Sequence, residues 1–237
     1  MKSHVLLIGW WLLVFQAAHA QVIITNDTSS PDPAAGLEVK FDGKGFLPPR
    51  MTTVQMLAIP SPPEGLLIYN TTIHGIVYRS NEGWKSLNGA HFLGEGYGGG
   101  IIFYLDATGQ HGLIAAANDQ PMLPWGCYPF SIPGTSTLWG TGQANTTTIV
   151  AGCLDMGAAR ECDELELNGY SDWYLPSRDE LVEMYNQRDI IGNMVPSFYW
   201  SSSENDGGTA FSESFEWGYN YGRAKYDYCY VRAIRSF

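Results

Sequence analysis

The chain has 237 residues and a formal net charge of −11, from 24 acidic side chains against 13 Lys and Arg. Nucleic-acid-binding proteins present a positive surface to phosphates, so this charge argues against that class and against loose electrostatic binding of sulfated polysaccharides. Aromatic residues make up 14% of the chain and charged residues only 16%, a composition that excludes a disordered protein. We expect one good-sized folded domain and a smaller module.

Residues 1–20 have the pattern of a signal peptide. Lys2 supplies the positive end, residues 5–15 are an apolar run, and Ala-His-Ala at 18–20 fits an A-x-A cleavage site. The apolar run is too short to span a bilayer comfortably, and no later segment is apolar enough to be a transmembrane segment. No Cys follows the cleavage site to carry a lipid anchor. We expect the mature chain to be secreted or held at the cell surface.

Residues 21–88 are expected to form a small β-rich module. Thr52 and Gln55 stand in capping-box spacing, which predicts a short helix over residues 54–59, ended by the prolines that follow. Turn-forming residues between apolar runs then predict three strands, at residues 65–70, 75–79 and 84–87.

Residues 89–237 are expected to form the larger domain. Thr148 can cap a helix over residues 149–164, and a second helix follows over residues 178–188. Strands are predicted, in order, at residues 101–106, 111–117, 199–203, 209–217, 223–228 and 230–234. Strands, then two helices, then strands indicate an α+β fold.

The most informative segment is residues 168–181. The Asn-Gly pair at its start favours positive φ and marks a turn. Ser177 and Glu180 stand in capping-box spacing directly after Pro176, which predicts the start of the second helix. The residues expected to build this part of the fold are Trp173, Pro176, Ser177, Glu180 and, in the next strand, Trp200.

Three separated blocks carry a family resemblance: residues 169–181, Tyr-Trp-Ser-Ser-Ser-Glu at 199–204 and Val-Arg-Ala-Ile-Arg at 231–235. Together they resemble DUF1566, also called the Legionella collagen-like protein C-terminal domain, over about residues 90–237. The resemblance implies a C-type-lectin-like domain with two helices and short antiparallel strands. It also implies adhesion, since the family's named member binds host polysaccharides. This chain lacks collagen repeats and is strongly acidic, which disfavours a sulfated glycan.

Residues 45–52, 65–71 and Trp84 resemble a module of Bacteroidetes surface proteins and phage tail-fibre-like proteins, with its Gly-Phe-Leu-Pro-Pro-Arg-Met-Thr run. The resemblance implies a stalk or adaptor at residues 21–88, often associated with trimers. We therefore expect a homotrimer through this module. The alternative is an ordinary small β domain with no oligomeric role.

The four cysteines, an even number in an exported chain, favour two disulfides. Three connectivities are possible. The resemblance to C-type-lectin-like domains favours Cys162–Cys229, from a helix to the final strand, which leaves Cys127–Cys153 as the other pair. The alternative is that some of the four are free buried thiols. Their spacings do not resemble a zinc site.

Glu204, Asn205 and Asp206 are ligand candidates. Carboxylate and amide oxygens are hard ligands that suit Ca²⁺, and sugar-binding C-type lectins place Glu and Asn together on a loop that holds Ca²⁺ and sugar hydroxyls. The alternative is a polar turn ahead of two glycines. We expect no cofactor, and Ca²⁺ at these three residues is the alternative.

Trp217, Tyr219 and Tyr221 are the second set of ligand candidates. If the backbone is extended there, the three rings share one face, because strand side chains alternate. A partly exposed aromatic row suits stacking on the C–H faces of sugars or docking of a protein. The alternative is a hairpin whose rings cover the core.

Two other patterns are interpreted as structural. Gly94, Gly96 and Gly99 fit G-x-G-x-x-G but lead into a strand, so they predict a tight turn rather than a nucleotide site. The three serines at 201–203 lack the surroundings of a nucleophile elbow and are expected to close a strand end.

We therefore expect an exported surface or extracellular binding protein, an adhesin-type module that recognises a glycan or a surface protein and is not an enzyme. The first alternative is a structural subunit of a fibre or surface appendage. The second is an oxidoreductase similar to the formylglycine-generating enzyme, which shares the broader lectin-like fold and uses paired reactive cysteines.

Overall fold

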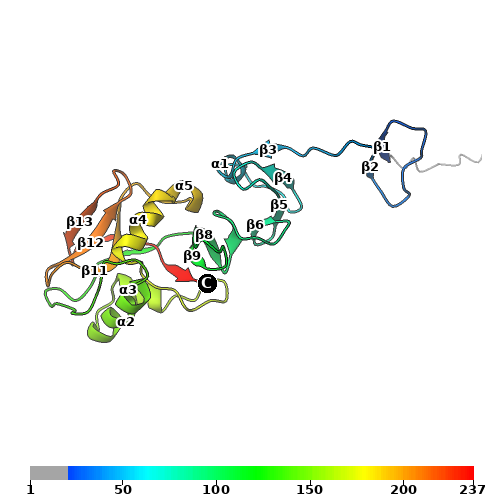
Figure 1. The fold of residues 1–237 in the computed structure, drawn as a ribbon. Coiled ribbons are helices and arrows are strands. Elements are labelled where there is room, and N and C mark those ends of the chain that lie inside the picture. The colour runs from blue at the N-terminus through cyan, green and yellow to red at the C-terminus, as the bar shows by residue number, and fades with distance from the viewer. Residues whose placement is uncertain (1–20) are drawn as a thin grey trace, which may run out of the picture. The chain divides into compact units, whose positions relative to one another are not determined.

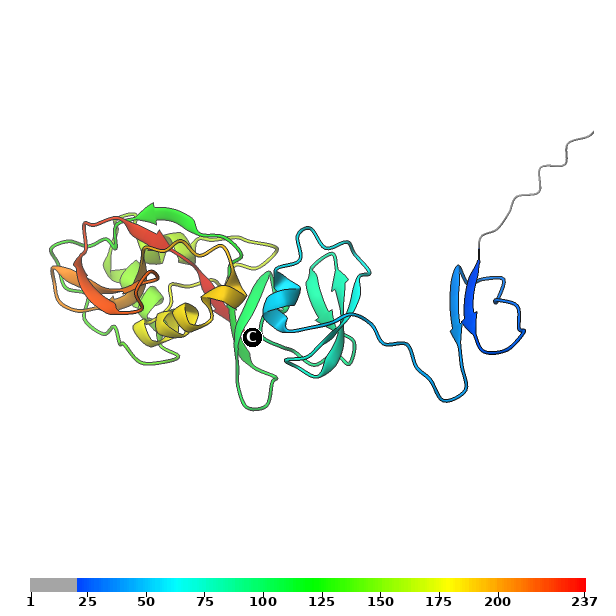
Figure 2. The same ribbon diagram turned by 90° about the horizontal axis from the view of Figure 1, so that it is seen from above.

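The computed structural model describes residues 21–237, so the predicted signal peptide at 1–20 lies outside the described residues. The chain forms two compact units that divide between Leu47 and Pro48. The ribbon is shown in Figure 1 and, turned by 90°, in Figure 2. Among the described residues, no helix is long and apolar enough to cross a membrane.

The first unit holds a parallel pair of strands, β1 (Val22–Thr25) and β2 (Leu37–Lys40). Their register puts two apolar side chains from each strand on one face of the pair: Val22, Ile24, Leu37 and Val39. These four residues are between 38% and 59% exposed. A two-stranded ribbon is marginal in water by itself, so this apolar face is suited to contact with another chain.

The second unit begins with a four-stranded sheet in the order β3-β4-β5-β6 and one short helix. The elements are β3 (Arg50–Met51), α1 (Thr53–Leu57), β4 (Leu67–Asn70), β5 (Gly75–Ser80) and β6 (Gly83–Ser86). α1 starts at the capping box that the spacing predicts, in which Thr52 accepts from the Gln55 N–H and the Gln55 side chain accepts from the Thr52 N–H. A small core fills this part of the unit: Met56, Ile68, Val77, Trp84 and Phe92.

Residues 48–88 pack directly on the remainder of the second unit. Gly83 and Gly96 approach so closely that a Cβ on Gly83 would lie 2.8 Å from the Gly96 Cα. α1 contacts α5 (Arg188–Ile191) near Gly94, where a Cβ would come within 3.1 Å of a leucine side chain. The structure thus couples residues 48–88 to the larger domain, and the boundary between residues 88 and 89 stays a prediction.

Two further sheets build the remainder of the unit. One has the order β15-β9-β8-β7, with β7 (Gly96–Tyr97), β8 (Gly100–Leu105), β9 (Gly112–Ala115) and β15 (Ile234–Ser236). The other has the order β10-β14-β11-β12-β13, with β10 (Gln120–Leu123), β11 (Phe198–Glu204), β12 (Thr209–Ser214), β13 (Asn220–Ala224) and β14 (Cys229–Val231). Neighbouring strands are antiparallel except β11 and β14, and β13 forms one edge.

Helices cover both faces of the sheet that contains β11: α2 (Gly142–Gly152), α3 (Ala158–Asp163), α4 (Arg178–Asn186) and α5. Adjacent residues of β11 face opposite sides. Trp200 therefore joins Trp173 and the apolar residues of α2 and α3, whereas Tyr199 joins those of α4 and α5. Trp173 and Trp200 are 1% and 0% exposed. These sheets and helices confirm the α+β class.

The helix predicted over residues 149–164 is two helices. α2 begins well before Thr148, which is therefore not a cap, and its backbone turns extended at Cys153. α3 starts after Gly157, where a Cβ would lie 2.5 Å from the Trp125 carbonyl oxygen. The close approach of this distant backbone interrupts the helix, and local periodicity carries no signal of it.

Candidate ligand-binding surface

Three exposed rings lie on the edge strand β13 and in the turn before it. They are called the aromatic row: Trp217, Tyr219 and Tyr221. They are 60%, 46% and 56% exposed, so the alternative that these rings cover the core is wrong. The rings of Trp217 and Tyr219 lie nearly parallel, with 9° between their planes and 6.1 Å between their centroids. This aromatic row presents flat apolar faces with polar tips to solvent.

A tight turn between β12 and β13 positions the row. The strand predicted at residues 209–217 ends at Ser214, and Gly218 takes a left-handed φ of +71°. The Gly218 backbone lies against the ring of Tyr185 from α4, so a Cβ at Gly218 would come within 2.5 Å of that ring. Trp217 therefore lies in the turn, which corrects the prediction that the strand runs through it.

Glu204 is held as an ion-pair partner. Its Oε1 accepts from the Lys225 ammonium and from the Ile132 N–H at 2.8 Å, and its Oε2 accepts from the Ser131 hydroxyl at 2.9 Å. The Lys225 side chain is fully buried. This pairing could not be predicted from the sequence, because 21 residues separate the two side chains and no motif links them.

Asn205 and Asp206 close the turn that follows β11. Asp206 Oδ1 accepts from the N–H groups of Gly208 and Thr209, both at 2.8 Å, and the Asn205 amide donates to the Thr209 hydroxyl at 2.8 Å. Hydrogen bonds to its carboxylate lower the pKa of Asp206, and the bond from the Gly208 N–H has the largest effect. These contacts support the polar-turn interpretation, and the described residues hold no group of three or more His, Cys, Asp or Glu that could bind a metal.

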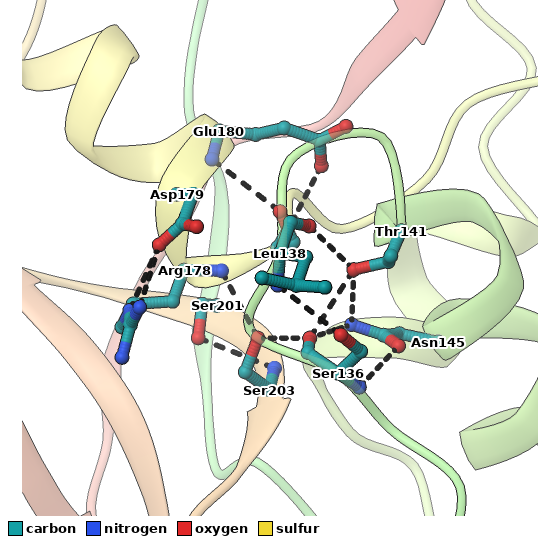
Figure 3. Close-up of polar contacts among 10 residues, drawn as sticks. Ser136, Leu138, Thr141, Asn145, Arg178, Asp179, Glu180, Ser201 and Ser203 are labelled. Atoms are coloured by element: carbon teal, nitrogen blue, oxygen red, sulfur yellow. Dashed lines mark hydrogen bonds and ion pairs between the residues drawn. The ribbon is translucent and has the colours of Figure 1, made fainter.

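Of the three serines at 201–203, Ser202 and Ser203 bond to residues at the start of α4, and Figure 3 shows the contacts of Ser203. Ser203 Oγ accepts from the Arg178 N–H at 3.0 Å and donates to the Ser136 carbonyl at 2.8 Å. The other two hydroxyls also donate to backbone carbonyls. All three residues are fully buried, so these hydroxyls serve the architecture.

Glu180 lies between the start of α4 and the start of α2. It forms the predicted capping box with Ser177, whose N–H donates to Glu180 Oε2 at 2.7 Å and whose Oγ accepts from the Glu180 N–H at 3.3 Å. A Cβ on Gly142, the first residue of α2, would collide with this carboxylate. Burial raises the pKa of Glu180. The contacts of Ser177 and Glu180 in the segment 168–181 therefore serve the architecture.

The glycine run at 94–100 forms a hairpin turn between β7 and β8. Gly98 and Gly99 take φ values of +54° and +88°, the left-handed pair that a two-residue hairpin loop requires. The run leads into a strand, as predicted. It borders a groove of about 490 Å³ that Lys85 and Tyr170 also line.

Cys127 and Cys153 form a disulfide, as predicted. The structure contradicts the predicted Cys162–Cys229 bridge, because both of these side chains are buried and unbonded. That bridge requires a cysteine on the final strand, whereas Cys229 lies on β14 and the final strand is β15, in a different sheet. The alternative of free buried thiols holds for this pair.

Titration of the unfolded, unreduced protein should find two free thiols, and four after reduction. In the folded protein both thiols should react slowly, because the thiolate is the reactive form. Burial raises the pKa of Cys229 to about 12 and that of Cys162 far above its ordinary value. A count of zero free thiols before reduction would contradict the structure and restore the second bridge.

The protein has an α+β fold, and the aromatic row gives it an exposed aromatic surface at a sheet edge. Residues 133–235 match the family model of the Lcl C-terminal domain. Residues 24–103 match the model of the phage tail like trimerisation region. Both resemblances seen in the sequence motifs are thereby confirmed.

The crystal structure of a fimbrial protein from Bacteroides ovatus ATCC 8483 is similar to this chain at 12% sequence identity and a TM-score of 0.44. The similarity covers 71% of this chain, which spans 60% of the fimbrial protein. A search of curated proteins finds no match.

Proposed function

We propose that the chain is an exported surface or extracellular protein, an adhesin-type module that recognises a glycan or a surface protein and is not an enzyme. The exposed aromatic row carries this proposal, because large apolar surfaces left in water mark interaction sites. The match to the Lcl C-terminal domain supports a C-type-lectin-like fold for residues 89–237. The signal-peptide pattern at 1–20 supports export.

The charges around the row favour a neutral glycan or a protein over a sulfated glycan. The whole chain carries −11, which repels polyanions. The nearest cation along β13, Arg223, lies 4.5 Å from the centroid of the Phe198 ring and pairs with Asp227 at 3.2 Å. The exposed faces of the Trp217 and Tyr219 rings are flat and apolar, and a sugar ring can stack on such a face.

A glycan array with neutral and sulfated members tests the placement. Residues 21–237 should bind at least one neutral glycan, and Trp217→Ala with Tyr219→Ala should weaken binding roughly tenfold or more, about 1.4 kcal/mol. Trp139→Ala is the matched control, since that ring is 41% exposed on a different loop. If the double variant binds glycans as tightly as the wild type does, the glycan does not bind at the aromatic row. Binding to sulfated glycans alone would contradict the ligand class.

A structural subunit of a fibre or surface appendage is the second candidate, which the first unit favours. Residues 24–103 match the trimerisation region, and one face of the β1–β2 pair exposes four apolar side chains. Three copies can cover these faces against one another. We propose a homotrimer in which residues 21–88 serve as stalk or adaptor.

Size-exclusion chromatography with light scattering tests the trimer. Residues 21–237 should elute with three times the monomer mass, and Ile24→Asp with Val39→Asp should give monomers, because a charge on the apolar face cannot be buried unpaired. Thr25→Asp, on the opposite face of β1, is the control. A stable trimer without glycan binding favours the structural role, and a monomeric wild type contradicts the trimer.

The third alternative, an oxidoreductase similar to the formylglycine-generating enzyme, has little support. Its chemistry requires reactive cysteines, and the two unpaired ones are 0% and 1% exposed, at Cys162 and Cys229. Burial raises the pKa of both thiols, which suppresses the thiolate.

A further inference from the structure

Four exposed rings form a second aromatic surface, called the loop cluster: Tyr128, Phe130, Tyr226 and Tyr228. They are between 51% and 71% exposed. The rings of Tyr128 and Tyr226 are perpendicular, with centroids 5.0 Å apart, so the two loops that carry them present one surface. Contiguous exposed apolar surface is typical of interaction sites, which makes the loop cluster a candidate for one.

A buried lysine fixes the loops beneath the cluster. The Lys225 ammonium donates to the Phe130 carbonyl at 2.8 Å, pairs with Glu204 and lies 4.6 Å from the Trp125 ring. The Lys225 backbone accepts from the Trp125 N–H at 2.9 Å and donates to the Gly208 carbonyl at 3.0 Å. A single residue thus ties together three loops that are far apart in sequence.

Two further contacts restrict the loop that carries Tyr128 and Phe130. The Cys127–Cys153 disulfide joins its start to the end of α2, and a Cβ on Gly207 would lie only 3.0 Å from the Pro129 carbonyl oxygen. Rings held by rigid loops lose little conformational entropy when they bind. A buried ion pair adds little net stability because of its desolvation cost, so its position here is better explained by preorganisation of the surface above it.

The groups around the loop cluster favour an uncharged ligand with many hydroxyls. Both nearby cations are paired, Lys225 with Glu204 and Arg223 with Asp227, so they offer no free charge to a sulfate or carboxylate. Three of the four rings carry a phenolic hydroxyl. Apolar ring faces with polar tips complement sugar rings, which present C–H faces and hydroxyls together.

We propose that the loop cluster is a second saccharide-binding surface, which binds a neutral saccharide chain. This inference rests on the proposed function. The aromatic row begins before β13, with Trp217 and Tyr219. The loop cluster includes two rings after β13, Tyr226 and Tyr228, so the two surfaces lie at opposite ends of one strand. A strand of five residues spans roughly 17 Å. A long saccharide can bridge that distance, and two linked contacts bind more tightly than either alone.

Affinity gel electrophoresis of residues 21–237 tests the proposal. The gels contain dextran, mannan, laminarin or galactan as neutral polysaccharides, with heparin as the anionic probe. We expect retardation by at least one neutral polysaccharide and none by heparin. Tyr226→Ala with Tyr228→Ala should weaken that binding at least fivefold. Tyr226→Phe with Tyr228→Phe should bind with an affinity between those of the alanine variant and the wild type. Trp139→Ala is the control, and thermal unfolding checks that each variant remains folded.

The outcomes separate the two surfaces. If the tyrosine variants bind like the wild type while Trp217→Ala with Tyr219→Ala does not, the second surface is refuted and the proposed function stands. If no neutral polysaccharide retards the wild type, the saccharide assignment of both surfaces fails. If the tyrosine variants instead lose self-association in light scattering, the loop cluster is a contact between copies and the proposal is overturned.

Discussion

Replacing Lys225 by Met should lower the free energy of unfolding by about 3–5 kcal/mol. The Lys225 side chain is 0% exposed and that of its partner Glu204 only 8%. Methionine keeps most of the apolar volume but removes the counter-charge, which leaves a carboxylate buried and unpaired. The donors from Ser131 and Ile132 remain, and they compensate for only part of the lost interaction.

Urea unfolding followed by tryptophan fluorescence measures this loss. Adding Glu204→Gln to Lys225→Met should recover part of the stability, because an amide needs no counter-ion. Lys44→Met, at an exposed lysine, is the control and should change the free energy of unfolding little. If Lys225→Met unfolds at the same urea concentration as the wild type, the ion pair does not hold these loops and does not preorganise the loop cluster.

The features that could be predicted from the sequence are local ones. The capping boxes at Thr52 and at Ser177 depend on residues three positions apart, so their spacing is enough to predict them. The same holds for the turn at Asn168 and Gly169, which both take positive φ. For the same reason the strands of the β4–β5 and β8–β9 hairpins lie within two residues of their predicted bounds, whereas the strand predicted at 223–228 lies at Asn220–Ala224.

The features that could not be predicted depend on distant parts of the chain. Glu204 was predicted as a ligand because of its own neighbours, but its role depends on Lys225, which no motif connects to it. The break between α2 and α3 depends on the Trp125 backbone. Cys229 was assigned to the final strand, since nothing in the sequence separates β14 from β15.

The stability of the protein should fall as the pH rises from about 4.5 to about 7, and Glu213→Gln should remove that part of the fall. Glu213 on β12 is 1% exposed, and its Oε2 has no hydrogen-bond partner among the described residues. Burial raises the pKa of Glu213 from 4.5 to about 7. In the unfolded chain the carboxyl releases its proton near 4.5, whereas in the folded chain it keeps the proton to about 7. Its contribution to stability is therefore complete below pH 4.5 and is lost as the pH approaches 7.

The difference in the free energy of unfolding between the wild type and Glu213→Gln reports on this carboxyl alone, because other buried acids such as Glu180 are present in both proteins. One pKa unit corresponds to 1.36 kcal/mol, so the glutamine variant should gain up to about 3 kcal/mol relative to the wild type above pH 7.5. Below pH 4.5 the two proteins should unfold alike, because the neutral acid and the amide are similar in shape and charge. Urea unfolding at pH 4, 6 and 8 provides the measurement, with Glu216→Gln at an exposed position as the control. A glutamine variant that is no more stable than the wild type at pH 8 would show that Glu213 reaches solvent or a cation when it ionises.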